Sequence, residues 1–323
     1  MKKMISYGAA IQNAFEYILS NYDDSFIIGQ GLWSPWYVGN TMVDLDKKFG
    51  KERIIDCPVS ENSITGAALG AALNGMKAIV VHPRMDFMVL ASDQIVNQAA
   101  KWQSMLGGGI KIPLTIRSII NRGGEQGAQH SQALHSWYAH IPGLRVVMPA
   151  FANDARDLLI ASILSNDPVL YIDDRWCADL VEEETDLKEL DIQKIGPKKI
   201  KDGSDLTIVG SGFTSYQAFQ AGNELMKENI NAEIIDCRVL NPFNPKVIID
   251  SVMKTKKLIV LDGSWKNCGF GAEILASVSE HFTDFKSKPI RMGLKDSPAP
   301  TSKPLEEDYY INIHDIVNNA KSI

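Results

Sequence analysis

A glutamate at the start of a helix is the first residue whose type and position could serve chemistry. An apolar strand is predicted to end at Pro58, and a helix rich in glycine and alanine begins near Glu61. In an open parallel sheet, ligands bind just beyond the carboxyl ends of the strands. A carboxylate there could hold or move a proton on a bound ligand. The alternative interpretation is a first-turn carboxylate that only stabilises its helix through the helix dipole.

A glycine-rich polar segment supplies the second candidate. Residues 121–132 read N-R-G-G-E-Q-G-A-Q-H-S-Q and follow the strand expected at 114–119, so they also lie at a carboxyl edge. Long loops in compact domains are often functional, and His130 could donate or accept a proton near neutral pH. A surface loop with a solvated histidine is the alternative. For His135 and His140, packing in a core or an interface is the preferred interpretation.

The elements that must position these residues alternate between short β-branched runs and amphipathic stretches. This pattern is typical of parallel sheets covered by helices on both faces. In the first half we expect strands at 26–29, 54–57, 78–82, 114–119, 145–148 and 169–172, with helices at 7–20, 61–74, 91–106 and 153–164. In the second half we expect strands at 206–209, 232–235, 258–261 and 290–292, with helices at 214–227, 246–254 and 272–281.

The sequence therefore predicts an α/β fold with two doubly wound domains in series, residues 1–190 and 191–323. The connection between them is expected within residues 180–204, which hold few apolar side chains. The run Lys198, Lys199 and Lys201 is interpreted as part of this solvated linker.

Composition excludes several classes of function. Hydrophobic residues make up 45%, charged residues 22%, and the net charge is −6, so nothing indicates a nucleic-acid groove. No stretch approaches the roughly 18 apolar residues that span a bilayer, and the N-terminus lacks the apolar core of a signal peptide.

The four cysteines are too far apart for a zinc or disulfide pattern. Neither G-x-G-x-x-G after the first strand nor a Walker loop occurs, so no NAD site is expected. The cytoplasm is the predicted location.

Six blocks, in collinear order, carry a resemblance to a known family. They are R-I-I-D-C-P-V-S-E-N at 53–62, D-Q-I-V-N-Q-A-A-K at 93–101, A-Q-H-S-Q at 128–132, H-I-P-G-L-R-V-V-M-P at 140–149, S-V-M-K-T at 251–255 and G-F-G-A-E-I at 269–274. Together they resemble the β subunit of the thiamine-diphosphate-dependent decarboxylase component of pyruvate and branched-chain 2-oxoacid dehydrogenases, within the transketolase-like superfamily. The third and fourth blocks distinguish this family from a transketolase C-terminal half. The resemblance implies a pyrimidine-binding domain followed by a transketolase C-terminal-like domain.

The resemblance also implies roles for four residues. Glu61 matches the glutamate that hydrogen-bonds a ring nitrogen of the cofactor's pyrimidine, where a carboxylate favours the protonated ring. Phe87 matches the aromatic residue that packs on the pyrimidine, and Pro83 stands beside the cofactor. His130 matches the histidine at the acyl-transfer end, a proton donor when a lipoyl disulfide is acylated.

Metals and partners follow from the same resemblance. The family binds a structural potassium ion through backbone carbonyls, at positions that match Leu114, Ser162, Ile163, Ser165 and Asp167. The cofactor's diphosphate and Mg²⁺ need a G-D-G motif and a downstream asparagine, a combination that this sequence lacks. A separate α-type subunit is expected to supply that half, in an α2β2 heterotetramer that could serve a lipoyl acyltransferase core.

Three departures from the family pattern leave the reaction open. The usual G-E-D-V is replaced by G-Q-G-L-W at 29–33, followed by Pro35 and Trp36; Pro83 replaces a longer side chain; Y-I-D-D-R-W at 171–176 replaces a common E-P stretch. The leading hypothesis is decarboxylation of a small 2-oxoacid with transfer of the acyl group to a lipoyl carrier. The second is half of a split transketolase-like enzyme that makes carbon–carbon bonds on a sugar or keto-acid intermediate. The third is a catalytically silent partner subunit.

Overall fold

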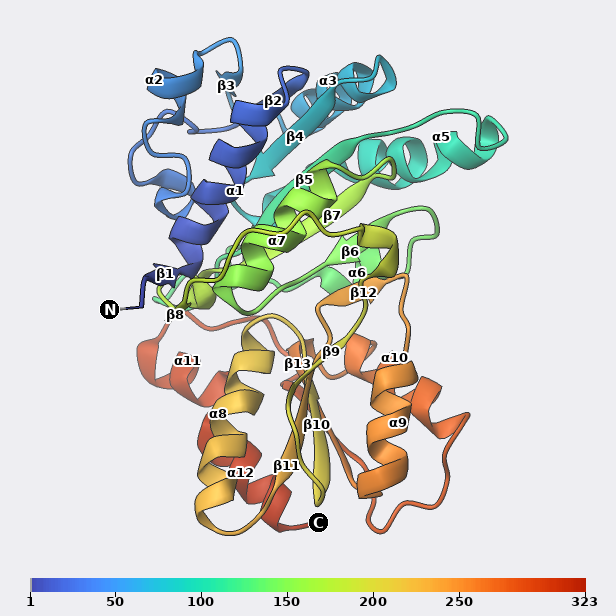
Figure 1. Cartoon of the computed structure of the whole chain (residues 1–323). Helices are drawn as coiled ribbons and strands as arrows, with labels where there is room; N and C mark the ends of the chain where they lie inside the picture. Colours follow the sequence, from blue (N-terminus) through green and yellow to red (C-terminus); the bar gives the residue numbers. More distant parts are fainter. Residues whose placement is uncertain (1) are drawn as a thin grey trace.

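The computed structural model describes residues 2–323, which fold into two α/β domains stacked end to end (Figure 1). The sheet of the first domain has seven strands in the order β12-β6-β7-β5-β4-β2-β3, and that of the second has five in the order β14-β13-β10-β11-β9. A short antiparallel pair, β1 and β8, lies apart from both. This architecture confirms the predicted fold class of two α/β units in series.

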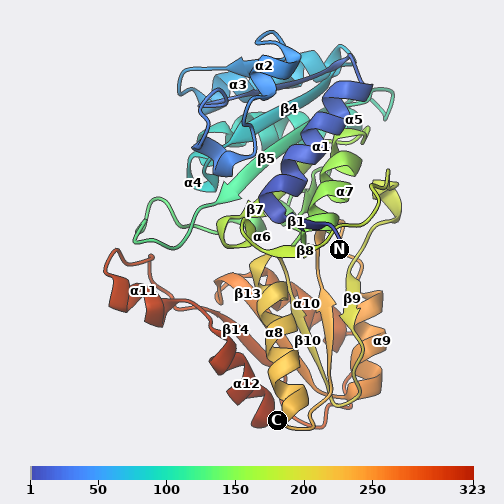
Figure 2. The same ribbon diagram turned by 60° about the vertical axis from the view of Figure 1, so that its left-hand side comes forward.

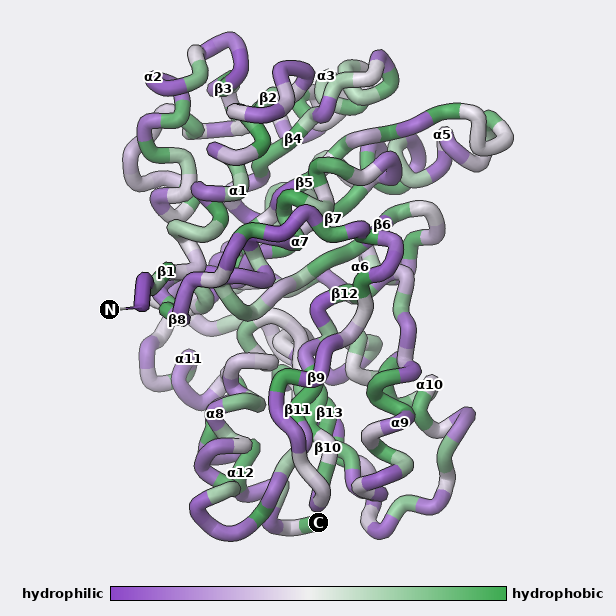
Figure 3. The backbone as a smooth tube through the Cα atoms, viewed as in Figure 1, coloured by the Kyte–Doolittle hydropathy of each residue, from purple (hydrophilic) through white to green (hydrophobic). Residues whose placement is uncertain are grey.

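Most of the strands follow the predicted apolar runs closely, but those at Met4–Ser6, Val181–Glu183, Lys198–Lys201 and Val239–Asn241 were not predicted. Those of the seven-stranded sheet are β2 (Ser25–Gly29), β3 (Ile54–Asp56), β4 (Lys77–His82), β5 (Leu114–Ile120), β6 (Arg145–Val147), β7 (Val169–Asp174) and β12 (Val239–Asn241). Those of the five-stranded sheet are β9 (Lys198–Lys201), β10 (Leu206–Gly210), β11 (Ala232–Asp236), β13 (Leu258–Trp265) and β14 (Ile290–Leu294), and the separate pair is β1 (Met4–Ser6) and β8 (Val181–Glu183). Figure 3 shows the central strands as largely hydrophobic, as expected of strands buried on both faces.

Helices cover both faces of each sheet. In the first domain they are α1 (Tyr7–Asn21), α2 (Leu45–Phe49), α3 (Glu61–Leu73), α4 (Met85–Met88), α5 (Ala100–Met105), α6 (His135–Ala139) and α7 (Ala152–Ile163). In the second they are α8 (Phe213–Lys227), α9 (Lys246–Thr255), α10 (Phe270–Ser279), α11 (Lys303–Tyr309) and α12 (Ile313–Lys321). The remaining helical elements are short. They are the 3₁₀ helices η1 (Tyr37–Asn40), η2 (Val89–Ala91), η4 (Arg175–Cys177) and η5 (Ile192–Lys194) and the π-helix η3 (Asp93–Ala99).

Alternating side chains of the first sheet face two separate cores. Ile27 and Ile79 pack with α1 and α7, whereas Ile28 and Val80 pack with α3. The helix α1 begins where Ser6 accepts a hydrogen bond from the backbone N–H of Ala9 at 3.2 Å, a standard N-cap. Burial on both faces explains why these strands read as continuous apolar runs in the sequence.

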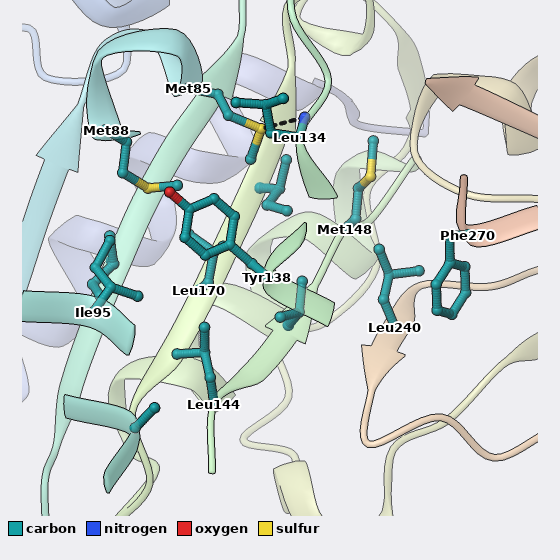
Figure 4. Close-up of a cluster of buried hydrophobic side chains, with 14 of the residues drawn as sticks. Met85, Met88, Ile95, Leu134, Tyr138, Leu144, Met148, Leu170, Leu240 and Phe270 are labelled. Carbon is teal, nitrogen blue, oxygen red and sulfur yellow. Dashed lines mark hydrogen bonds between the residues drawn. The ribbon is translucent and has the colours of Figure 1, made fainter. Parts of the chain in front are cut away.

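One hydrophobic core runs across the boundary between the domains. Figure 4 shows Tyr138 and Met148 of the first domain beside Leu240 and Phe270 of the second, all buried. Strand β12 adds to this continuity, because it belongs to the second half of the sequence but pairs antiparallel with β6 in the first sheet. We therefore expect the two domains to unfold together, because separating them would expose the apolar side chains of this shared core to water.

The segment interpreted as a solvated linker is more structured than predicted. Lys198, Lys199 and Lys201 belong to β9, which pairs antiparallel with β11 at the edge of the second sheet. The linker interpretation was wrong for this run, because lysines on an edge strand can stay solvated while their backbone extends the sheet. The helix predicted at 91–106 is also broken into η3 and α5, with α4 added before it.

Buried charges join the domains at the end of β5. The Arg122 side chain is 2% exposed, pairs with the Asp174 carboxylate, and donates to the carbonyl of Gly263 in β13 at 2.6 Å. Its guanidinium also lies 4.8 Å from the centre of the Trp176 ring. His135 contacts Asp262 at 3.0 Å in the same interface. Burial alone would raise the pKa of the Asp262 carboxyl, but His135 and two backbone N–H groups lower it overall.

We expect Arg122→Met to lower the free energy of unfolding by about 3–5 kcal/mol, because Asp174 would remain buried without its counter-charge. Urea unfolding followed by circular dichroism measures this difference. The double variant Arg122→Met with Asp174→Leu removes both charges and should recover most of the loss. Equal losses in the single and double variants would show that the unpaired Asp174 charge is not the cause of the loss.

Candidate active site

The carboxyl ends of five parallel strands meet at one edge of the first sheet. The register pairs Gly29 with Asp56 and with Val81, His82 with Ser118, and Ile120 with Asp174. The segments that follow these strands therefore start at the same edge, and they carry all four cofactor-site residues predicted from the sequence. This is the position at which open α/β sheets bind ligands.

Glu61 lies in the first turn of α3, as the sequence predicts, and is 7% exposed. The preceding residue, Ser60, makes no side-chain capping hydrogen bond. One turn later, the Thr65 hydroxyl donates to the Glu61 carbonyl at 2.8 Å and lies 3.1 Å from His82 Nε2. These contacts tie the start of α3 to the end of β4.

His82 is a member of this edge that sequence reasoning missed. Burial lowers the pKa of its imidazole to about 4, so the ring is neutral at pH 7. With the Thr65 hydroxyl donating to the Glu61 carbonyl, the contact pairs with the tautomer that carries the ring proton on His82 Nε2. Its Nδ1 is buried without a partner among the described residues. A histidine at the end of an apolar strand was the only signal in the sequence.

Phe87 and His130 are brought together by the fold. Their rings form an edge-to-face pair with centroids 5.2 Å apart and an interplanar angle of 84°. Phe87 belongs to α4, and His130 lies in the long loop between β5 and α6 (Figure 2). Such an arrangement holds the imidazole of His130 against the Phe87 ring and leaves the imidazole nitrogens available to a ligand.

Asp86 anchors the same loop and was also missed from the sequence. Its Oδ1 accepts hydrogen bonds from the backbone N–H of Gln132 at 3.1 Å and from the Gln132 side-chain amide at 3.0 Å. Burial raises the pKa of the Asp86 carboxyl, and the two bonds from Gln132 only partly offset that effect. Its Oδ2 is buried with no partner within residues 2–323. An unpartnered buried oxygen beside Phe87 fits a site that a polar ligand completes.

A cavity of about 370 Å³ lies at the same edge, bounded by the segment after β2 and by the ends of β4, β5 and β7. Pro83 lines this cavity, whereas Glu61, Phe87 and His130 do not. Its charged and amide side chains are Arg84, Arg117, Asn121, Gln126, Asp173, Asp174 and Arg175. Its size falls within the range of small-molecule sites.

The glycine-rich loop is shaped by close contacts with Trp176 of the first domain and with α11 of the second. Gly123 has φ +83°, and a Cβ there would lie 2.3 Å from the Trp176 indole nitrogen, so only glycine fits. The backbone N–H of Glu125 donates to the Glu306 carboxylate of α11 at 3.0 Å (Figure 2). These contacts hold the loop against α11 and thereby position His130.

The residues matched to a potassium site lie on two segments that one backbone hydrogen bond joins. Leu114 begins β5, and Ser162 and Ile163 end α7, with Ser165 and Asp167 in the turn that follows. The Ile112 N–H donates to the Asn166 carbonyl at 2.9 Å, which joins the two segments. The Ser162 carbonyl already accepts the Ser165 N–H at 3.2 Å. Across residues 2–323, no group of three or more His, Cys, Asp or Glu side chains could hold a metal ion.

Two domain families match the two halves of the chain. The transketolase pyrimidine-binding domain family matches residues 3–175, and the transketolase C-terminal domain family matches residues 197–316. The pyruvate dehydrogenase E1 component subunit beta of Dictyostelium discoideum is 34% identical, over 99% of this chain and 91% of the relative. That of Gracilaria tenuistipitata var. liui is 34% identical over 97% of each chain.

Two further similarities widen the group. The β subunit of acetoin:2,6-dichlorophenolindophenol oxidoreductase from Bacillus subtilis is 32% identical, over 96% of this chain and 94% of the relative. Among solved structures, a split-gene transketolase described as an inactive β4 tetramer superposes with a TM-score of 0.80. That structure is 19% identical and covers 98% of this chain and 97% of its own, so it supports the fold alone. None of the helices in residues 2–323 has the length and apolar character needed to cross a membrane.

Proposed function

The chain belongs to the β subunits of the thiamine-diphosphate-dependent 2-oxoacid dehydrogenase family, and from this we propose that it supplies half of an active site that decarboxylates a small 2-oxoacid. The proposed acceptor of the acyl group is a lipoyl carrier. The observation that carries the proposal is the contact between Phe87 and His130 at the sheet edge where the helix of Glu61 begins. The names of the relatives mention pyruvate and acetoin, and these names describe the relatives rather than this chain.

The residues at this edge fit the pyrimidine end of thiamine diphosphate. When bound, the cofactor accepts the electron pair released with carbon dioxide. We assign Glu61 the task of holding a proton on a pyrimidine ring nitrogen, since a carboxylate in a nearly buried position stabilises the charged ring. Phe87 would pack on the ring and Pro83 would border it. His130, beside Phe87, would donate a proton to the leaving sulfur of a lipoyl group.

The remaining parts of the site are assigned to a partner. We propose that an α-type subunit binds the diphosphate and Mg²⁺, because the sequence has no G-D-G motif. Several further points stay predictions. They are an α2β2 heterotetramer, contact with a lipoyl acyltransferase core, potassium bound by the carbonyls near Ser162, a domain boundary at residue 190 and a cytoplasmic location.

The shared site predicts that the purified chain alone binds thiamine diphosphate weakly. Titration calorimetry with cofactor and Mg²⁺ should give tight binding only when the α-type partner is present. We expect affinity to rise by 10³-fold or more on assembly, on the order of what several charge-assisted phosphate contacts contribute. Tight binding by the isolated chain would refute the two-subunit proposal.

A second candidate is the split transketolase-like activity, and one observation favours it. The three stretches that depart from the family pattern all contribute to one cavity, through Trp36, Pro83 and the residues Asp173–Arg175. A reshaped substrate pocket could serve a different acceptor, because fold does not fix function. Turnover of 2-oxoacids and ketose phosphates by the assembled pair separates the two reactions. An assembled pair that turns over neither class would support the third hypothesis, a catalytically silent partner.

A further inference from the structure

We propose that the cavity beside Pro83 is an anion subsite that selects substrates with a second negative group, a carboxylate or a phosphate distant from the reacting carbonyl. This inference rests on the proposed function for the adjoining edge, where Glu61, Phe87 and His130 are assigned to the cofactor. The residues that line this cavity in the structure include Arg84, Arg117 and Arg175.

The acidic side chains in the cavity are already neutralised. Asp173 accepts from the Tyr7 hydroxyl at 2.8 Å and from Arg117 Nε at 2.5 Å. Arg117 is committed further, because its Nη1 donates to the Thr41 hydroxyl at 2.7 Å. Asp174 is paired with the buried Arg122. Neither carboxylate is therefore left to repel an incoming anion.

Two arginines of the lining are not neutralised. Arg84 donates from Nη1 to the Gln126 amide oxygen at 2.9 Å, and Arg175 donates from Nη1 to the Gly123 carbonyl at 3.2 Å. Within residues 2–323, neither pairs with a carboxylate. Both contacts are with neutral acceptors, which orient a guanidinium but leave its charge uncompensated. Two oriented guanidinium groups at one cavity are the chemistry that binds carboxylate and phosphate groups.

The position of Arg84 links this subsite to the reacting end. Arg84 immediately precedes α4, and its carbonyl accepts the N–H of Phe87 at 3.2 Å. Pro83, between His82 and Arg84, lines the cavity. A substrate whose carbonyl reacts near Phe87 and His130 would therefore have an anionic tail within the reach of Arg84. The volume of about 370 Å³ suits such a tail.

Binding of probe anions to the full-length chain tests the subsite without turnover. Calorimetric titration with glutarate and with inorganic phosphate should give dissociation constants about tenfold or more higher for Arg84→Gln than for the wild type, since a charge-assisted contact is lost. Arg84→Lys, which keeps the charge, should lose less. Arg291→Gln is the matched control, because Arg291 donates to the Lys266 carbonyl outside the cavity. Stronger binding of glutarate assigns a carboxylate tail, and stronger binding of phosphate assigns a phosphorylated substrate.

The assembled α–β complex gives the second readout. The ratio of kcat/KM for 2-oxoglutarate to that for pyruvate should fall about tenfold or more in Arg84→Gln, or the corresponding ratio for a ketose phosphate if phosphate is the preferred probe. Probe binding that is absent in the wild type, or unchanged in Arg84→Gln, would overturn the subsite even if 2-oxoacids are turned over. A complex that binds the probes through Arg84 but decarboxylates no 2-oxoacid would instead refute the proposed function.

Discussion

Replacing Glu61 with glutamine should lower cofactor activation in the assembled enzyme by about 10²-fold or more, on the order of general acid–base effects. The change keeps the size and hydrogen-bonding capacity of the side chain but removes the charge that would stabilise a protonated pyrimidine. Proton exchange at the thiazolium carbon, followed by NMR, measures activation apart from later steps. Folding should change little, because loss of a charge at a helix N-terminus costs about 0.3–1 kcal/mol.

The matched control for this experiment is Glu273→Gln, which makes the same change in the first turn of α10. It removes a carboxylate from a helix N-terminus in the second domain, at a residue that is exposed. We expect its exchange rate to equal that of the wild type. If Glu61→Gln exchanged at the wild-type rate as well, Glu61 would be no more than a carboxylate that stabilises α3.

Replacing His130 with alanine should depress acyl transfer to a lipoyl domain by about 10²-fold or more, because the leaving sulfur would lose its proton donor. Decarboxylation measured with an artificial electron acceptor should be largely spared, since cofactor activation is assigned to Glu61. Both half-reactions should be measured on one preparation. The exposed His314 in α12 offers a control, and His314→Ala should alter neither half-reaction.

The same variant separates the two enzymatic hypotheses. A carbon–carbon bond-forming enzyme would show no lipoyl-dependent activity in the wild type, and His130→Ala would then impair ketose or aldehyde turnover directly. Equal losses of decarboxylation and lipoyl transfer would contradict the division of labour between Glu61 and His130. Because His130 forms an edge-to-face pair with Phe87, His130→Gln offers a second variant that keeps a polar side chain in place of the imidazole.

Local sequence determined the elements and the place of the first candidate residue. Apolar runs predicted β2 to β7 to within a few residues, because strands buried on both faces need continuous β-branched side chains. Glu61 was placed at the start of a helix, and α3 begins there. Strand β9 escaped this reasoning, since an edge strand of lysines has no hydrophobic pattern.

Tertiary structure alone decided which of these residues meet. The contact of Phe87 with His130 joins a short helix to a loop from another strand, and no periodicity reports such a pair. The neutral state of His82 depends on complete burial, a property of the packed domain. Arg84 and Arg175 are far apart in the sequence, and the two carboxylates that share their cavity are paired with Arg117 and Arg122 instead. Composition and spacing record which charges are present, whereas the fold determines which of them remain unpaired.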